Sequence, residues 1–396
     1  MSNKLTQQEV VLQIEAYLAE NYEFRNNCLS GKTEVRQTCG ISQKANEWEI
    51  LTENGFNTIV RQAKLDGIGG DSSPRQNIEE YILSAATPRF NPIMDFINNL
   101  PAWDGKNHLA ELFSRIPGIT SEQLAWCCTW FRSAVAHWMQ KDSLHGNETV
   151  PVLIGAQGCG KSTFANRLLP EHLRCYYLSR INFGNKFDRD MALANNLIVN
   201  IDEFDRFGPN QQAHLKQAVS EAKVNGRPIF GKSQEDRPRY ASFIATTNVE
   251  KPLTDPTGSR RYICLRVPNG KLIENVSDIN YSQLYAQAVA EVNADVPYWF
   301  NSAEVERIQQ ANIPFFRSED LEEMIKQCYS FPDDNETVEW VAGSKIYDTL
   351  KLRFPILAIH KSESLKSKIG KALREMDCKK KKSNHGVYYQ LIPIAV

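Results

Sequence analysis

The residues best suited to do chemistry form a glycine-rich stretch that runs from Gly155 to Ser162. Its letters, GAQGCGKS, fit the spacing GxxxxGK[ST] of a loop that surrounds nucleotide phosphates. Glycines allow backbone N–H groups to point at phosphate oxygens, and the N-terminus of a following helix adds positive potential. Lys161 would contact the β- and γ-phosphates, and the Ser162 hydroxyl would ligate Mg²⁺. The spacing therefore predicts a site for ATP and Mg²⁺, built from Gly155, Gly158, Gly160, Lys161, Ser162 and Thr163.

The elements that must position this loop can be recognised on either side of it. The apolar run Val150–Ile154 leads into the glycines, and a helical pattern that starts at Ser162 follows them. A glycine turn with a stray lysine is the alternative, and both flanking patterns argue against it. From Thr149 to about residue 300, apolar runs of strand length alternate with helical patterns. This alternation predicts an α/β fold in which helices cover a parallel sheet.

A pair of acids follows a second apolar run, about 40 residues further along the chain. Leu197–Ile201 has the pattern of a buried strand, and Asp202 and Glu203 come directly after it. We expect Asp202 to hold the Mg²⁺ shell and Glu203 to polarise a water for attack on the γ-phosphorus. Apolar strands that end in acids are common, so this prediction depends on the preceding glycine loop. The pair favours hydrolysis of ATP over a simple kinase, which needs a pocket for its acceptor.

Two further groups complete a candidate hydrolytic site. Phe243–Asn248 is another strand-like run, and its terminal Asn248 is suited to orient the attacking water from a neighbouring strand. Arg260 and Arg261 follow a flexible turn. A guanidinium beside a transferring phosphoryl group stabilises its charge, often from a neighbouring subunit. A turn-forming asparagine and a surface arginine pair are the alternatives, and the sequence does not decide which arginine acts.

A basic segment lies between the acidic pair and Asn248. Turn residues flank short extended pieces from Val224 to Arg239, a pattern compatible with a hairpin. Its cations would pair with nucleic-acid phosphates independently of base sequence. The alternative is a solvated loop whose arginines pair with Glu235 and Asp236. The candidate DNA contacts are Arg227, Lys232 and Arg237, with Arg239 close by.

The overall composition is that of an ordinary globular protein. Among 396 residues, 46 basic side chains nearly balance 47 acidic ones, so any surface that binds DNA must be local. No stretch approaches the ~18 apolar residues of a membrane span, and the first residues lack a secretory pattern, so we expect a cytoplasmic location. Nine cysteines without a CxxC pair and seven dispersed histidines argue against a disulfide scaffold and a zinc site.

Changes of pattern along the chain predict four parts. These are an α+β domain over 1–74, a helical lead-in over 75–145, the nucleotide-binding domain over 146–300 and a winged-helix-like domain over 301–396. In the lead-in, residues 121–139 form a helical pattern, for which we expect Ser121 to be the cap. In the last part, helical patterns at 345–351 and 364–375 precede a hairpin-like stretch. The basic side chains of this part suit contact with duplex DNA, and they are Lys366, Lys368, Lys371 and Arg374. The alternative is a solvated domain whose positive charge balances the acidic residues before it.

The order of these motifs resembles the ATPase core of the virulence-associated protein E family, which is related to superfamily 3 helicases and poxvirus D5-type primase-helicases. The resemblance runs through GAQGCGKS, IDEFD, the basic segment, ATTN and GSRR over about 145–270. Asn91-Pro92 and Trp103–Gly105 also look like the lead-in of that family. The resemblance implies an AAA+, superfamily 3-like P-loop NTPase fold and a hexameric, DNA-translocating ATPase of phages and other mobile elements.

The resemblance also implies roles for individual residues. Lys232 looks like the tip of a hairpin that projects into a central channel, although no aromatic residue for base stacking lies beside it. Matched by position, the family's functional groups are the Walker A residues Lys161 and Ser162, the Walker B residues Asp202 and Glu203, the sensor Asn248, and a finger at Arg260 or Arg261.

Three functions compete at this point. The leading hypothesis is an ATP-driven DNA motor, a hexameric helicase or replication initiator that holds single-stranded DNA in its channel. The second is a nucleotide-switched regulator that assembles on DNA or a partner, with a role in anti-phage defence included. The third is a P-loop kinase, which the absence of a recognisable lid or acceptor pocket disfavours.

Overall fold

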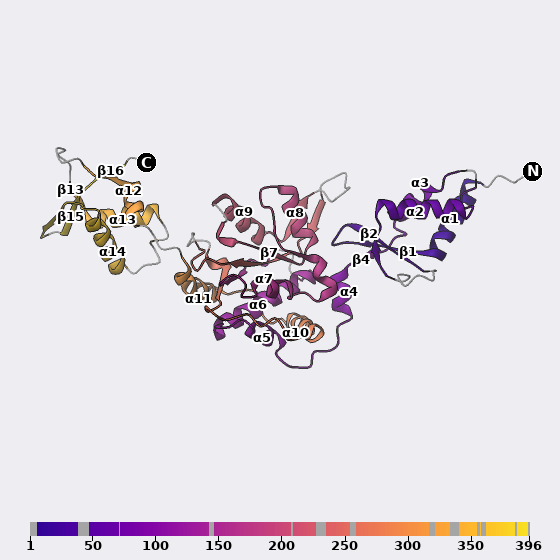
Figure 1. Ribbon diagram of the computed structural model, residues 1–396, viewed down its shortest axis with the longest axis horizontal. Helices are drawn as coiled ribbons and strands as arrows, with labels where there is room; N and C mark the ends of the chain where they lie inside the picture. Colours follow the sequence, from indigo (N-terminus) through magenta and orange to yellow (C-terminus); the bar gives the residue numbers. More distant parts are fainter. Residues whose placement is uncertain are drawn as a thin grey trace, which may run out of the picture.

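The fold is described from a computed structural model of the chain. It describes residues 6–38, 47–70, 72–141, 146–206, 209–226, 235–253, 259–316, 321–332, 340–354, 357, 362–384 and 386–394. Three bodies follow one another along the longest axis in Figure 1, with the N-terminal part at one end, the central sheet in the middle and the C-terminal part at the other end.

A five-stranded parallel sheet forms the middle of the molecule, so the predicted α/β class is confirmed. The spatial order of its strands is β11-β5-β10-β7-β6. Every neighbouring pair is parallel, as expected for strands joined by helical crossovers. The strands are β5 (Val150–Ile154), β6 (Tyr177–Leu178), β7 (Ile198–Ile201), β10 (Ser242–Thr247) and β11 (Tyr262–Arg266).

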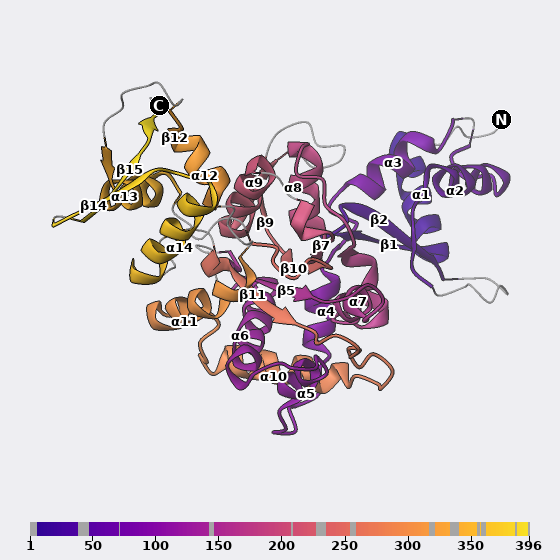
Figure 2. The same ribbon diagram turned by 60° about the vertical axis from the view of Figure 1, so that its left-hand side comes forward.

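Two hydrophobic clusters cover the two faces of this sheet. Alternate residues of β10 point to opposite faces, because side chains alternate along a strand: Ile244 joins one cluster, whereas Phe243 and Ala245 join the other. Figure 2 shows α5, α6 and α10 on one side of the sheet and α8 and α9 on the other. The helices of this body are α4 (Pro92–Asn98), α5 (His108–Ser114), α6 (Ser121–Trp138), α7 (Lys161–Asn166), α8 (Lys186–Asn195), α9 (Pro209–Ser220), α10 (Tyr281–Asn293) and α11 (Ser302–Asn312). Short 3₁₀ turns lie between them: η1 (Glu171–Tyr176), η2 (Phe204–Arg206), η3 (Ser259–Arg261) and η4 (Ile313–Phe315).

Two local predictions are corrected here. Thr120, and not Ser121, caps α6, because its hydroxyl accepts from the backbone N–H of Gln123 at 3.2 Å and the Gln123 side chain bonds back at 3.0 Å. Among the apolar runs of strand length predicted after Thr149, the run at Cys175–Ser179 forms a strand only at Tyr177 and Leu178, since the residues before them are wound into η1.

The N-terminal part is a second, smaller α+β unit. Its sheet has the order β3-β2-β1-β4, and its own hydrophobic cluster includes Ile14, Leu18, Ile59 and Ile78. The side chain of Asn27 donates to the Tyr176 hydroxyl at 2.7 Å, which joins this sheet to the middle body. Its elements are α1 (Gln7–Asn21), β1 (Tyr22–Asn27), β2 (Lys32–Gln37), β3 (Glu49–Ile50), α2 (Glu53–Leu65), α3 (Arg75–Leu83) and β4 (Arg89–Phe90).

The C-terminal part also has a separate hydrophobic cluster. The predicted helices are present, and the predicted hairpin is present because β14 and β15 pair antiparallel, with Ser383 opposite Gly386. The three-stranded sheet of this part has the order β13-β15-β14, so β14 is an edge strand. The elements are α12 (Leu321–Cys328), β12 (Tyr329–Ser330), β13 (Trp340–Ala342), α13 (Gly343–Arg353), α14 (Ser362–Glu375), β14 (Lys380–Ser383), β15 (Gly386–Gln390) and β16 (Ile392–Pro393).

Within the described ranges, no helix has both the length and the apolar character to pass through a membrane.

Candidate nucleotide site

A cavity of about 570 Å³ lies at the carboxyl edge of the central sheet. Because β5, β7 and β10 are parallel, the residues that follow them meet at this edge. Every sequence-predicted residue of the glycine loop and the acidic pair except Gly155 lines this cavity, together with Asn248. The lining residues are Gln157, Gly158, Gly160, Lys161, Ser162, Thr163, Asp202, Glu203, Asp205, Arg206, Thr247, Asn248 and Val249.

The glycine loop (Gly155–Ser162) needs its glycines for backbone shape and for close packing. Gly158 and Gly160 have φ angles of 80° and 92°, in the left-handed region that other residues rarely adopt. The Asn275 side chain donates to the Gly160 carbonyl at 3.0 Å. A Cβ on Gly160 would lie 2.6 Å from that same amide nitrogen, so a larger residue would displace this contact.

Lys161 is the central contact of the site, although its side chain is buried at 7% exposure. Its Nζ donates to the Gly155 and Ala156 carbonyls, each at 2.8 Å, and to Oδ1 of Asn248 at 2.9 Å. These contacts use the three donors of an ammonium group. Lys161 therefore connects the glycine loop to the end of β10, as expected if both flank one bound phosphate.

The acidic residues are held by two threonines at the end of β10. The Thr246 hydroxyl donates to Oδ1 of Asp202 at 2.6 Å, and the Thr247 hydroxyl donates to Oδ1 of Asp205 at 2.5 Å. Asp205, Thr246 and Thr247 were not among the predicted site residues. Their signal was present in the runs IDEFD and ATTN, since β10 lies directly beside β7.

Glu203 has a strained backbone and an exposed side chain. Its φ of 52° is uncommon for a residue other than glycine, and such strain accumulates at functional sites. One carboxylate oxygen lies 2.9 Å from the Arg206 guanidinium, and the side chains are 44% and 72% exposed. An ion pair this exposed contributes little stability, less than about 1 kcal/mol, so Glu203 remains available for other contacts.

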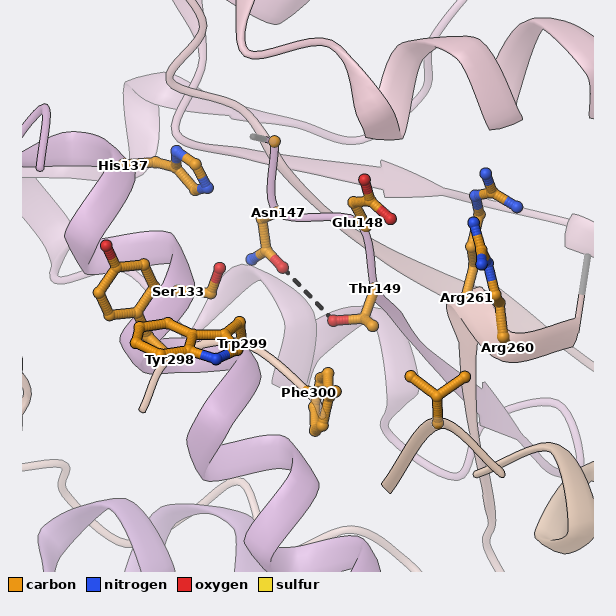
Figure 3. Close-up of a pocket in the computed structure, with 12 residues that line it drawn as sticks. Ser133, His137, Asn147, Glu148, Thr149, Arg260, Arg261, Tyr298, Trp299 and Phe300 are labelled. Carbon is orange, nitrogen blue, oxygen red and sulfur yellow. Dashed lines mark hydrogen bonds between the residues drawn. The ribbon is translucent and has the colours of Figure 1, made fainter. Parts of the chain in front are cut away.

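Arg260 and Arg261 lie at the opposite edge of the sheet. They precede β11, which runs parallel to β5 with Tyr262 opposite Val150, whereas the glycine loop follows β5. Five residues of strand separate the two edges by about 16 Å. Arg260 is exposed, and Arg261 is half-buried with one nitrogen 3.5 Å from the Ser220 hydroxyl. Figure 3 shows the two side chains next to each other, and both line a second pocket. Within one chain, the structure does not bring them to the glycine loop.

The basic segment forms a two-stranded antiparallel ladder, with β8 (Lys223–Gly226) paired to β9 (Glu235–Pro238). This pairing confirms a hairpin for the flanking strands. Arg227 and Lys232 lie outside the described residues. Arg237 turns back to α8, where it donates to Oδ1 of Asn195 at 3.3 Å.

The side chain of Arg239 is buried in the protein interior and does not face a surface that could bind DNA. Its guanidinium donates to four backbone carbonyls at 2.7–3.3 Å, those of Val219, Glu221, Ala241 and Asn147. Burial lowers the pKa of Arg239 to about 10, while the nearby acidic groups of Glu221 and Glu148 oppose that shift. Sequence reasoning could not separate this arginine from its exposed neighbours, because all of them lie in one basic run.

The donor set at the carboxyl edge fits Mg²⁺ bound together with phosphates. Ser162 offers an exposed hydroxyl and Asp202 a carboxylate, both oxygen donors of the kind that Mg²⁺ prefers. Across the part of the chain that the structure describes, no group of three or more His, Cys, Asp or Glu residues is arranged to hold a metal.

The model of the virulence-associated protein E-like domain matches residues 97–316, which is more than half of the chain. The chain belongs to this family. The matched residues contain the whole glycine loop, the acidic pair, Asn248 and both arginines. The family assignment inferred from the motifs is thus confirmed.

No curated protein matches the chain. Among solved structures, it is similar to two apo structures of the NrS-1 C-terminal region, each at 12% identity and each covering 98% of this chain and 100% of its own. Their TM-scores are 0.44 for the A form and 0.46 for the other.

Proposed function

We propose that this protein is an ATP-hydrolysing DNA motor that works as a hexameric ring, a superfamily 3-type helicase or replication initiator of a mobile genetic element. The observation that carries this proposal is the meeting of Lys161, Asp202, Glu203 and Asn248 around one cavity at the carboxyl edge of the sheet. The family membership of residues 97–316 supports the same proposal.

In the proposed mechanism, each group has a separate task. Lys161 and the backbone N–H groups of the glycine loop bind the β- and γ-phosphates. Ser162 and Asp202 would hold Mg²⁺, which supplies charge neutralisation on the phosphate oxygens when bound. Glu203 takes the proton of the attacking water, and Asn248 orients that water. The Lys161–Asn248 hydrogen bond supports this assignment, because it places the amide beside the phosphate-binding ammonium.

Arg260 is the better candidate for the finger, because its side chain is exposed whereas Arg261 is half-buried against Ser220. Its position at the opposite edge of the sheet requires that it act on the nucleotide of a neighbouring copy. Contacts between opposite edges are head-to-tail, and a head-to-tail arrangement closes into a ring when the rotation fits. The geometry is therefore consistent with a hexamer.

We propose two DNA-binding surfaces. The β8–β9 hairpin would bind single-stranded DNA in a central channel, and two of its candidate contacts, Arg227 and Lys232, lie outside the described residues. The C-terminal part would act as a winged helix on duplex DNA, since basic side chains of α14 and of the exposed edge strand β14 lie on its surface. These are Lys366, Lys368, Lys371, Arg374, Lys380, Lys381 and Lys382.

The decisive experiment measures ATP hydrolysis with and without single-stranded DNA. We expect DNA to raise the rate and Lys161→Ala to reduce it to background, with the variant still folded. Sedimentation in the presence of an ATP analogue should show a hexamer. Hydrolysis by a strict monomer, unchanged by nucleic acid, would contradict the proposal.

A nucleotide-switched regulator is the second candidate, because Lys161 joins the glycine loop to Asn248 at the end of β10. A nucleotide that binds between these two segments would reposition both without being hydrolysed. Assembly on DNA that needs ATP but is unchanged by Glu203→Gln would favour this function.

A further inference from the structure

A second cavity of about 570 Å³ lies at the amino edge of the central sheet, on the opposite side from the glycine loop. We call it the arginine pocket. Its walls come from α6, from the stretch before β5, from η3 and from the segment before α11 (Figure 3). The lining residues are Ser133, His137, Gly146, Asn147, Glu148, Thr149, Arg260, Arg261, Tyr298, Trp299, Phe300 and Val305.

The arginine pocket has a charged end and an aromatic end. Arg260, Arg261 and Glu148 lie at one end, and the ring of Trp299 lies at the other beside Tyr298 (Figure 3). Trp299 is 55% exposed, and its ring meets that of Tyr298 edge-on with centroids 4.9 Å apart. Trp, Tyr and Arg are the residue types that dominate binding energy at protein interfaces.

Hydrogen bonds hold the Asn147 side chain at the wall of the pocket. The buried side chain of Asn147 donates to the Trp130 carbonyl at 3.1 Å and to the Ser242 hydroxyl at 3.0 Å. At the charged end, Arg260 is exposed, so its guanidinium can donate to an incoming anionic group.

A strand of nucleic acid is a poor occupant. The lining holds two adjacent arginines and one glutamate. A nucleic-acid strand needs a continuous cationic track, and two adjacent arginines beside a glutamate do not form one. The pocket instead suits a surface that presents one anionic group together with apolar side chains.

The carboxyl edge of the same sheet is such a surface. Three carboxylates face Lys161 and Arg206 in its cavity, and bound ATP would add further negative charge. Large apolar side chains are exposed at this edge, among them Val249 at 40% and Val276 at 93%. Val276 belongs to a segment held on the glycine loop by the hydrogen bond from Asn275 to Gly160.

We propose that the arginine pocket receives the glycine-loop edge of a second copy of this chain, with Trp299 as the apolar anchor at the opposite end of the pocket from Arg260. This inference rests on the proposed function and adds a binding element to it. The anchor fixes the neighbouring copy at the pocket, so that Arg260 meets the nucleotide of that copy. Trp299 is thus a positioning residue, and Arg260 makes the contact with phosphate.

Assembly of the full-length chain tests the anchor directly. With Mg²⁺ and a non-hydrolysable ATP analogue, Trp299→Ala should raise the protein concentration for half-assembly at least about tenfold in sedimentation velocity. Trp340→Ala, which removes a 40% exposed indole from the C-terminal part, is the matched control and should assemble as the wild type. Binding of the analogue by dilute, unassembled Trp299→Ala protein should be unchanged, which shows that the variant folds. Unchanged assembly of Trp299→Ala overturns the proposal.

Mixed assemblies separate this inference from the proposed function. Lys161→Ala and Arg260→Ala chains should be inactive alone and active when mixed, because one supplies the arginine and the other the nucleotide. The Lys161→Ala chain supplies the acting arginine and therefore the pocket that must dock. Adding Trp299→Ala to this chain should reduce the activity of the mixture at least about tenfold more than adding it to the Arg260→Ala chain. Both mixtures contain the same amount of Trp299, so a general defect affects them equally.

Each result of the mixing experiment has one meaning. Equal activity in the two mixtures contradicts a Trp299 anchor in the pocket of the acting arginine, while the proposed function stands. Failure of the parent variants to complement contradicts the proposed arginine in trans, and the sedimentation result then decides the anchor separately.

Discussion

The Nζ of Lys161 lies 2.9 Å from Oδ1 of Asn248, although 87 positions separate the two residues in the chain. The contact exists because β10 is inserted between β5 and β7 in the sheet. As a result, the amide of Asn248 lies between the glycine loop and the acidic residues. In the proposed mechanism, this one hydrogen bond links the residue that binds phosphate to the residue that orients the attacking water.

The first prediction concerns this hydrogen bond. Asn248→Ala should lower kcat for ATP hydrolysis about 10- to 100-fold, with a much smaller change in the dissociation constant for ATP, because the amide orients water and Lys161 keeps its two loop carbonyls. Steady-state kinetics together with calorimetric ATP binding measure the two effects. Asn293→Ala, at an exposed position of α10, is the control. Loss of ATP affinity without loss of kcat would refute this role.

The second prediction distinguishes the role of Glu203 from that of Arg206, with which it forms an ion pair. Glu203→Gln should reduce hydrolysis at least about 100-fold and still bind ATP, because an amide cannot take the proton of water. Arg206→Ala should change the rate less than about fivefold, since the exposed ion pair is worth under about 1 kcal/mol. Single-turnover assays with the two variants in parallel measure both. Equal losses would mean that Arg206 has a direct part in the reaction.

The third prediction concerns the buried guanidinium of Arg239. Arg239→Met should lower the free energy of unfolding by about 3 kcal/mol, because four carbonyls, three of them in buried contacts, lose their donor. Urea unfolding measures the loss, and Arg180→Met at an exposed position should cost less than about 0.5 kcal/mol. If Arg239→Met instead weakened DNA binding in a stable protein, the structural role would be wrong.

The low pKa of Arg239 also has a defined effect on stability. Burial favours the neutral form, so the unfolded chain holds this proton to higher pH than the folded chain, whose pKa is about 10. The contribution of Arg239 to stability is therefore constant below about pH 9 and rises only above its folded pKa. The loss caused by Arg239→Met should accordingly be the same at pH 6 and pH 8, and a clear difference between the two would contradict this environment.

The fourth prediction tests the C-terminal basic surface. Replacement of Lys380, Lys381 and Lys382 by alanine should weaken duplex DNA binding and reduce the slope of log K against log salt by about 2 to 3, since each phosphate contact contributes about 0.9. Fluorescence anisotropy at several salt concentrations measures the slope. Alanine at Lys32, Lys64 and Lys106, three exposed lysines elsewhere, keeps the change in charge the same. An identical slope for both triple variants would exclude a dedicated surface on β14.

Much of the site at the carboxyl edge of the sheet can be predicted from local sequence. The glycine spacing, the acids after Ile201 and the polar end of β10 are each read from one strand and its next residues, because strand ends of a parallel sheet meet at one edge. The same local patterns predict the C-terminal helices and hairpin. Thr120 shows the limit of this reasoning, since adjacent Thr and Ser residues are equivalent caps until backbone geometry selects one.

Strand order and burial, by contrast, are properties of the folded chain. The position of β10 between β5 and β7 places Asn248 at Lys161 and Thr246 at Asp202, and no local pattern specifies that order. Packing also buries Arg239 and leaves Arg260 exposed, although both belong to basic runs with similar residues around them. These outcomes depend on contacts between residues far apart in the chain, and only tertiary packing determines which of those contacts form.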